Sequence, residues 1–263
     1  MTIPPLLFAL LMWFIGTAAV VWLDSRPVRT FATSFRLSGI VMLVATYVVW
    51  LMADDTSWSG AYVGFGAAIL IWGWHEMGFL MGFVAGPNKA PCPPDAVGWH
   101  RFKLATATVI HHEIAIAANL LVLVAITWGQ PNQSAPLTFA LLFGLRLSAK
   151  FNLFLGVPNL SDEIFPAHLA YLKSYFGKKA INWLFPFAVI ANAGVATWAW
   201  LAAESLPTNS GASVTATLLA GLAALGVVEH LFLVLPLRDA KMWTWASASK
   251  PAPSTAAKAV IIE

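Results

Sequence analysis

Seven long apolar runs dominate this 263-residue sequence, and they restrict it to one class of fold. A helix rises about 1.5 Å per residue, so runs of roughly 20 apolar residues can cross the hydrocarbon core of a bilayer. The chain is 59% hydrophobic and only 10% charged, which is too few polar residues to cover a soluble domain of this length. We therefore predict an all-α, polytopic membrane protein. Its spans lie near residues 3 to 23, 36 to 53, 60 to 85, 103 to 128, 135 to 156, 179 to 203 and 212 to 236.

Thirteen of the 15 basic residues lie in the loops or at the ends of the spans, and they indicate the orientation of the chain. All of them fall on the side that the chain reaches after its first, third, fifth and seventh spans. Loops on the other side, such as "ADDTSWSG" and "GQPNQSAP", have none. The positive-inside rule then predicts a multi-pass membrane protein with a periplasmic or external N-terminus and a cytoplasmic C-terminus. The residues are Arg26, Arg29, Arg36, Lys89, Arg101, Lys103, Lys173, Lys178, Lys179, Arg238, Lys241, Lys250 and Lys258. Because they are dispersed over short loops, no nucleic-acid partner is expected.

The domain organisation is simple. We expect a single transmembrane domain over residues 1 to 246 and a flexible cytoplasmic tail over 247 to 263, whose Pro, Ala, Ser and Lys cannot build a core. In the third span, Gly78, Gly82 and Gly86 recur every fourth residue. Such a strip of small residues predicts close packing against a neighbouring helix.

One cytoplasmic loop, near residues 162 to 177, is predicted to form an amphipathic helix. Phe165, Leu169, Leu172 and Phe176 are spaced so that they share one helical face. That face is expected to lie on membrane lipids or, alternatively, to bind a partner protein.

Ionisable residues occur deep inside four of the predicted spans. Counted at about 1.5 Å per residue, the innermost ones lie roughly 10 to 15 Å from the cytoplasmic ends of their spans, which predicts a shared polar layer. Each charge left alone near the bilayer centre costs roughly 3 kcal/mol, so these groups must pair, become protonated or bind a ligand. The candidate residues are His75, Glu76, His111, His112, Glu113, Arg146, Lys150, Glu229 and His230.

Three uses of this layer are open. Imidazoles and carboxylates are the ligands of a zinc or di-iron site, and a divalent metal held by residues among His75, His112, Glu113, Glu229 and His230 would make the protein a membrane-embedded enzyme for a lipophilic substrate. A transmembrane His can instead ligate the metal of a tetrapyrrole, while Arg146 and Lys150 hold an anionic group. The third use is a hydrogen-bonded network that orients helices without any ligand.

Four stretches of the sequence resemble a known family: "WGWHEMGFLMGFVAGPNKAPCP", "ATVIHHE", "RLSAKFNLFLGVPNLSDEIFPAHLAYLKSYF" and "LGVVEHLFLVLPL". They are similar to the photosynthetic complex assembly protein 2 (PuhE) family of purple phototrophic bacteria. The resemblance runs from the third span to the end of the seventh. It implies an inner-membrane protein that assists assembly of the photosynthetic reaction centre and core light-harvesting complex, with bacteriochlorophyll as a candidate cofactor. It implies those subunits and membrane lipids as partners, and it supplies no catalytic residues.

Overall fold

All seven predicted spans are helices in the computed structural model of this protein, which describes residues 4–159, 166–235 and 245. Each is long and apolar enough to cross a membrane, and the described residues contain no strand. The prediction of an all-α, multi-pass protein is therefore confirmed. The helices are α1 (Pro5–Asp24), α2 (Phe31–Leu51), α3 (Trp58–Leu80), α4 (Gly98–Ile126), α5 (Ser134–Leu155), α6 (Leu184–Ser205) and α7 (Gly211–Phe232). Two short 3-10 helices, η1 (Val28–Thr30) and η3 (Ala167–Tyr175), lie in the loops.

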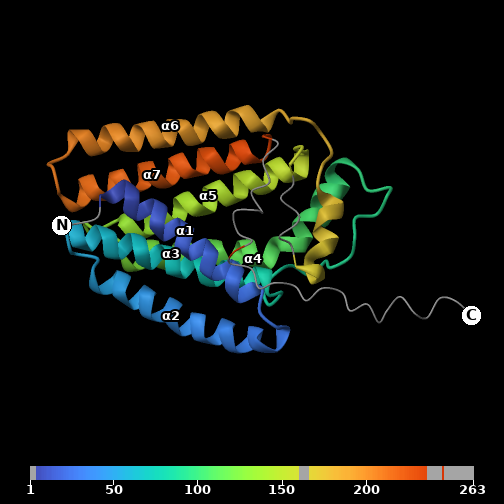
Figure 1. Cartoon of the computed structure of the whole chain (residues 1–263), viewed down its shortest axis with the longest axis horizontal. Coiled ribbons are helices and arrows are strands. Elements are labelled where there is room, and N and C mark those ends of the chain that lie inside the picture. Colours follow the sequence, from blue (N-terminus) through green and yellow to red (C-terminus); the bar gives the residue numbers. More distant parts are fainter. Residues whose placement is uncertain (1–3, 160–165, 236–244, 246–263) are drawn as a thin grey trace, which may run out of the picture.

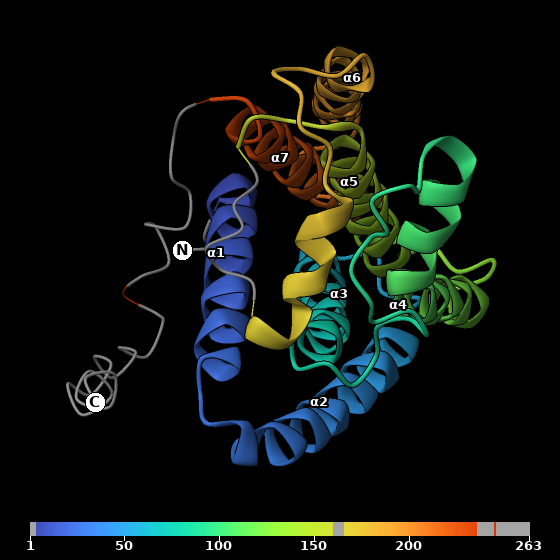
Figure 2. The ribbon, with the colours of Figure 1, turned by 90° about the vertical axis from the view of Figure 1, so that its right-hand side faces the viewer.

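Helix α3 forms the centre of the bundle. It contacts α1, α2, α4, α5 and α7, and Figure 2 shows it enclosed by them while α6 lies outermost, beside α7. Phe65, Ala68 and Ile71 of α3 are completely buried. His75 and Glu76, in the second half of α3, therefore lie against other helices and not against lipid.

Loops that carry basic residues gather at one end of the bundle. The connections α1–α2, α3–α4 and α5–α6, together with η3, lie at the right-hand end in Figure 1. The connections at the other end are the short segments 52–57, 127–133 and 206–210, which contain no Lys or Arg. This separation agrees with the charge pattern of the sequence, and the assignment of the basic end to the cytoplasm stays a prediction.

The glycine strip of the third span is not helical throughout. α3 ends at Leu80, five residues earlier than predicted, and Gly82 follows with a φ of +80°, a conformation that glycine adopts without strain. Gly78 packs against the ring of Phe35 on α2, whereas Gly86 lies in the loop against the backbone of α4. The prediction of a strip on one helix was therefore wrong, although two of its glycines do permit close approaches.

The loop after α3 also bends α4. The amide N–H of Asn88 donates to the carbonyl of Ala107 at 3.1 Å, and the amide N–H of His112 donates to the carbonyl of Ala85 at 3.0 Å. A group that inserts into a helix's own hydrogen-bond ladder kinks it. Figure 2, which looks along the bundle, shows the first turns of α4 lying across the direction of the other helices.

The predicted amphipathic helix is the 3-10 helix η3. Leu169 and Leu172 are buried against Phe79 and Ala85, so its apolar residues cover the end of the bundle and do not face lipid. The hydroxyl of Tyr175 donates to the carbonyl of Ala90 at 3.1 Å and fixes η3 to the α3–α4 loop. Phe165 and the tail from residue 247 lie outside the described residues.

Replacing Gly86 by Ala is expected to destabilise the fold. An added Cβ would overlap the backbone of Ala107 and Thr108, so the loop has to move, at a cost of about 1 to 3 kcal/mol of the free energy of unfolding. Thermal unfolding in detergent measures the loss. Gly144→Ala on α5 is the matched control, because its added Cβ meets no atom within 4 Å. Equal unfolding temperatures for the two variants would contradict the close approach.

Candidate functional site

Two ion pairs connect α5 to its neighbours inside the bundle. Nη2 of Arg146 lies 2.8 Å from Oε2 of Glu76 on α3. One turn further along, Nζ of Lys150 donates to Oε1 of Glu113 on α4. Residues at i and i+4 share one face of a helix, so a single face of α5 supplies both cations. Each cation pairs with a carboxylate from a different helix, and the pairs fix α3, α4 and α5 to one another.

The formal charge of these four side chains is zero. From the sequence, three carboxylates face two cations, which would leave a proton or a metal ion to balance the sum. Glu229 is exposed on α7, and neither of the two ion pairs involves it. The layer is thus neutral with two carboxylates and two cations.

Two imidazoles, those of His75 and His112, lie near the ion pair between Glu76 and Arg146. His112 is completely buried, its ring centroid is 4.8 Å from that of Phe79, and its Nε2 is 4.0 Å from Oε1 of Glu76. His75 is also buried and contacts the rings of Trp74 and Phe139 edge-on. Both imidazoles are therefore packed among aromatic rings in the interior of the bundle.

A separate hydrogen-bonded cluster surrounds His230 on α7. Its Nδ1 lies 2.7 Å from the carbonyl of Gly226, and its Nε2 lies 2.9 Å from Oγ of Ser148 on α5. Nδ2 of Asn192 on α6 is 3.2 Å from the same Nδ1. This cluster joins α5, α6 and α7, and its histidine is completely enclosed.

Ser148 was not among the predicted site residues. It stands two positions after Arg146, so it faces away from the ion pairs and toward α7. A hydroxyl within a helix commonly bonds its own backbone, which is why its sequence position alone did not indicate a role.

His111 differs from the other intramembrane histidines. It follows the bend of α4 and is exposed on the outer surface of that helix, whereas His112 points inward. Consecutive residues of a helix point about 100° apart, so only one of the two can face the core. The structure therefore brings Glu76, His112, Glu113, Arg146 and Lys150 together and leaves His111, Glu229 and His230 elsewhere.

The metal site considered from the sequence has no counterpart in the described part of the chain. No three His, Cys, Asp or Glu side chains there lie close enough together to hold a metal ion. The candidate ligands are divided among the ion-paired layer, the His230 cluster and the surface.

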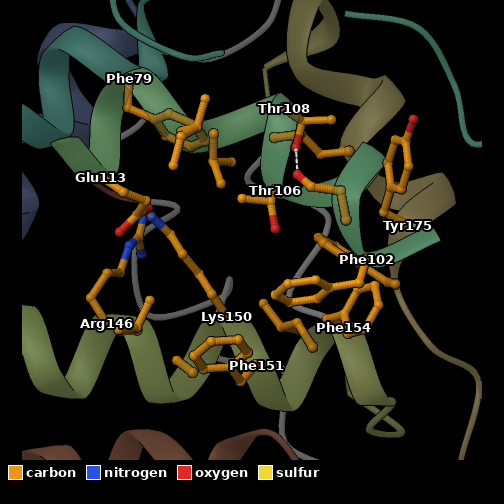
Figure 3. A pocket seen from close by; sticks show the side chains of 18 of the residues that line it. Phe79, Phe102, Thr106, Thr108, Glu113, Arg146, Lys150, Phe151, Phe154 and Tyr175 are labelled. Carbon is orange, nitrogen blue, oxygen red and sulfur yellow. Dashed lines mark hydrogen bonds and ion pairs between the residues drawn. The ribbon is translucent and has the colours of Figure 1, made fainter. Parts of the chain in front are cut away.

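A cavity of about 450 Å³ lies between α4 and α5. Figure 3 shows Glu113, Arg146 and Lys150 meeting at one end and Phe102, Phe154 and Tyr175 at the other, with Thr106 projecting between them. η3 contributes part of the lining through Leu172 and Tyr175, and nearly all remaining lining atoms are apolar. Further lining residues are Phe79, Ala105, Thr108, Val109, Ile110, Ile114, Ala117, Phe143, Leu147, Ala149, Phe151, Leu153 and Phe176.

The fold and this site together define a polytopic helical membrane protein with an internal ion-paired layer beside an apolar cavity. The chain belongs to the DUF3623 family, described as "Protein of unknown function", whose match covers residues 1–254. It is 37% identical over 252 residues to the "Uncharacterized 30.4 kDa protein in puhA 5'region" of Rhodobacter capsulatus, a match that spans 94% of this chain and 92% of that protein. No solved structure matches the fold.

The pairing of Arg146 with Glu76 is testable by a double-mutant cycle. Arg146→Gln leaves a buried carboxylate without its partner, so we expect a loss of about 3 to 5 kcal/mol in the free energy of unfolding. Adding Glu76→Gln should recover much of this loss, because no charge then stays unpaired. The comparison cycle combines Arg146→Gln with Glu113→Gln. Because the carboxylate of Glu113 pairs with Lys150, we expect a much smaller coupling energy between Arg146 and Glu113. Equal coupling energies in the two cycles would contradict the assignment.

Proposed function

We propose that this protein assists assembly of the photosynthetic reaction centre and core light-harvesting complex in the bacterial inner membrane. The observation that carries the proposal is the similarity along nearly the whole chain to a Rhodobacter capsulatus protein described by its position 5′ of puhA. Two further points support it. The sequence resembles an assembly-factor family, and a bundle of seven candidate spans has lateral access to membrane subunits.

The assembly role has a direct genetic test. In a Rhodobacter capsulatus strain that lacks the relative, we expect reduced near-infrared absorbance of the reaction centre and core antenna. Expression of this chain should restore it, because the two proteins align over 94% of this chain. An undiminished spectrum in the deletion strain would contradict the role.

Within this role, we propose that the protein handles bacteriochlorophyll through His111. Of the four intramembrane histidines, His75, His112 and His230 are enclosed, at 4%, 0% and 1% exposure, and cannot reach a pigment without unpacking the core. His111 is exposed, and an imidazole nitrogen is a suitable axial ligand for the metal of a tetrapyrrole.

The surroundings of His111 suit a flat macrocycle. Ala107 and Ala115, four residues before and after it, are small, so a flat ring can approach His111 along that line, with the exposed Ile114 bordering it on the other side. Ala107 also lines a shallow hollow of about 260 Å³ together with Ile110 and Phe102. An imidazole facing lipid without a ligand would expose its polar nitrogens to hydrocarbon, which favours occupation of this position.

His111→Leu is expected to reduce the bacteriochlorophyll that copurifies with the protein, because leucine supplies no metal ligand but suits a lipid-facing surface. The absorbance of the purified protein per mole of chain measures the reduction. His100→Leu is the matched control, since His100 is also exposed on α4 but lies in its first turn. Equal pigment content in the wild type and both variants would contradict the role of His111 and leave the assembly role to its own test.

A further inference from the structure

We propose that the cavity between α4 and α5 binds the head group of an isoprenoid quinone. Such binding goes beyond the assembly role and does not depend on it. It concerns a different surface from His111, which does not line the cavity.

Charge balance favours an uncharged ligand. Glu76 with Arg146 and Glu113 with Lys150 already form two ion pairs, so the polar end of the cavity is neutral before anything binds. An anionic or cationic head group would add an uncompensated charge to a cavity whose walls are almost entirely apolar. Such a charge costs roughly 3 kcal/mol near the bilayer centre. Arg146 and Lys150 are already paired with carboxylates, so an anionic group, which the sequence suggested as their ligand, is disfavoured here.

The polar end presents hydrogen-bond donors. The side chain of Arg146 is 35% exposed, the most of the four charged side chains, and only its Nη2 is used in the ion pair with Glu76. Lys150 has three N–H donors, one of which is given to Glu113. Figure 3 also shows the hydroxyl of Thr106 directed into the space between the two ends. A ligand oxygen that only accepts hydrogen bonds, as a quinone carbonyl does, suits this arrangement.

The walls suit a flat ring. Six phenylalanines line the cavity, and Phe102 and Phe154 meet edge to face at its far end, with centroids 5.7 Å apart. Aromatic side chains bind flat apolar rings by offset or edge-to-face contact. The six are Phe79, Phe102, Phe143, Phe151, Phe154 and Phe176.

The size of the cavity distinguishes between lipophilic ligands. A volume of about 450 Å³ lies toward the small end of ligand sites, which span about 300 to 1,000 Å³. A substituted benzoquinone ring is of this size, whereas a tetrapyrrole macrocycle is far larger. Ile114 and Phe151 line the cavity and are 58% and 38% exposed, so an isoprenoid tail can leave past them into lipid.

Binding of a short-chain ubiquinone to the purified full-length protein in nanodiscs tests this proposal. We expect saturable binding at one site per chain, and isoprenoid quinone in a solvent extract of the protein isolated from its native membrane. Ala117→Phe should weaken ubiquinone binding at least about tenfold, because Ala117 lines the cavity and the new ring fills it. Ala149→Phe fills the same space from α5 and serves if the first variant is unstable.

Ala118→Phe is the matched control. Ala118 is exposed on α4 and does not line the cavity. The affinity of this variant for ubiquinone should therefore stay within about twofold of that of the wild type. Non-saturable partition, or equal affinity in the cavity-filling and control variants, would overturn the proposal. An extract without isoprenoid quinone, whether or not it holds bacteriochlorophyll, would do the same. None of these outcomes bears on the assembly test, which is read from the absorbance of cells.

Discussion

The absence of water in the hydrocarbon core is the constraint on which this structure depends. Four charged side chains lie inside the bundle, and each would cost roughly 3 kcal/mol if it stood alone. Arg146 and Lys150 avoid this cost because they share a face of α5 that lies between α3 and α4. The same two pairs determine how these three helices are rotated relative to one another. A rotation of α5 by one residue would separate both cations from their carboxylates.

The two ion pairs also determine the charge of the cavity beside them. Because the charges balance within the protein, the cavity next to them has a polar end with no net charge. The bend of α4, produced by the loop that contains Ala85 and Asn88, directs the first turns of that helix away from the bundle axis. Phe102 and Thr106 belong to these turns and line the cavity, so its shape depends on the loop. η3 then covers the same end of the bundle. A lipid-accessible chamber with a donor-rich inner end follows from these features together.

The sequence allowed the spans and the need for pairing to be predicted, but not the partners. Length and apolarity determine that a segment crosses the membrane, so all seven helices were found, with every end within five residues of its predicted place. The depth of a residue in the membrane can be counted from its position along the span. The direction in which its side chain faces cannot be predicted when the span is apolar on every side. Glu229 lies at a suitable depth but on the exposed side of α7, and His111 differs from His112 only by rotation. The cavity was not foreseen, because hydrogen bonds between a loop and the interior of α4 leave no periodic pattern in the sequence.

The most direct test of the central claim is a measurement of the two ion pairs in a bilayer. Solid-state NMR of the isotopically labelled protein can detect dipolar coupling between the side-chain nitrogens of Arg146 and Lys150 and the carboxyl carbons of Glu76 and Glu113. We predict contacts of Arg146 with Glu76 and of Lys150 with Glu113, at the short distances of hydrogen-bonded ion pairs. Absence of both contacts in a folded sample, or coupling of either cation to Glu229 instead, would contradict the account.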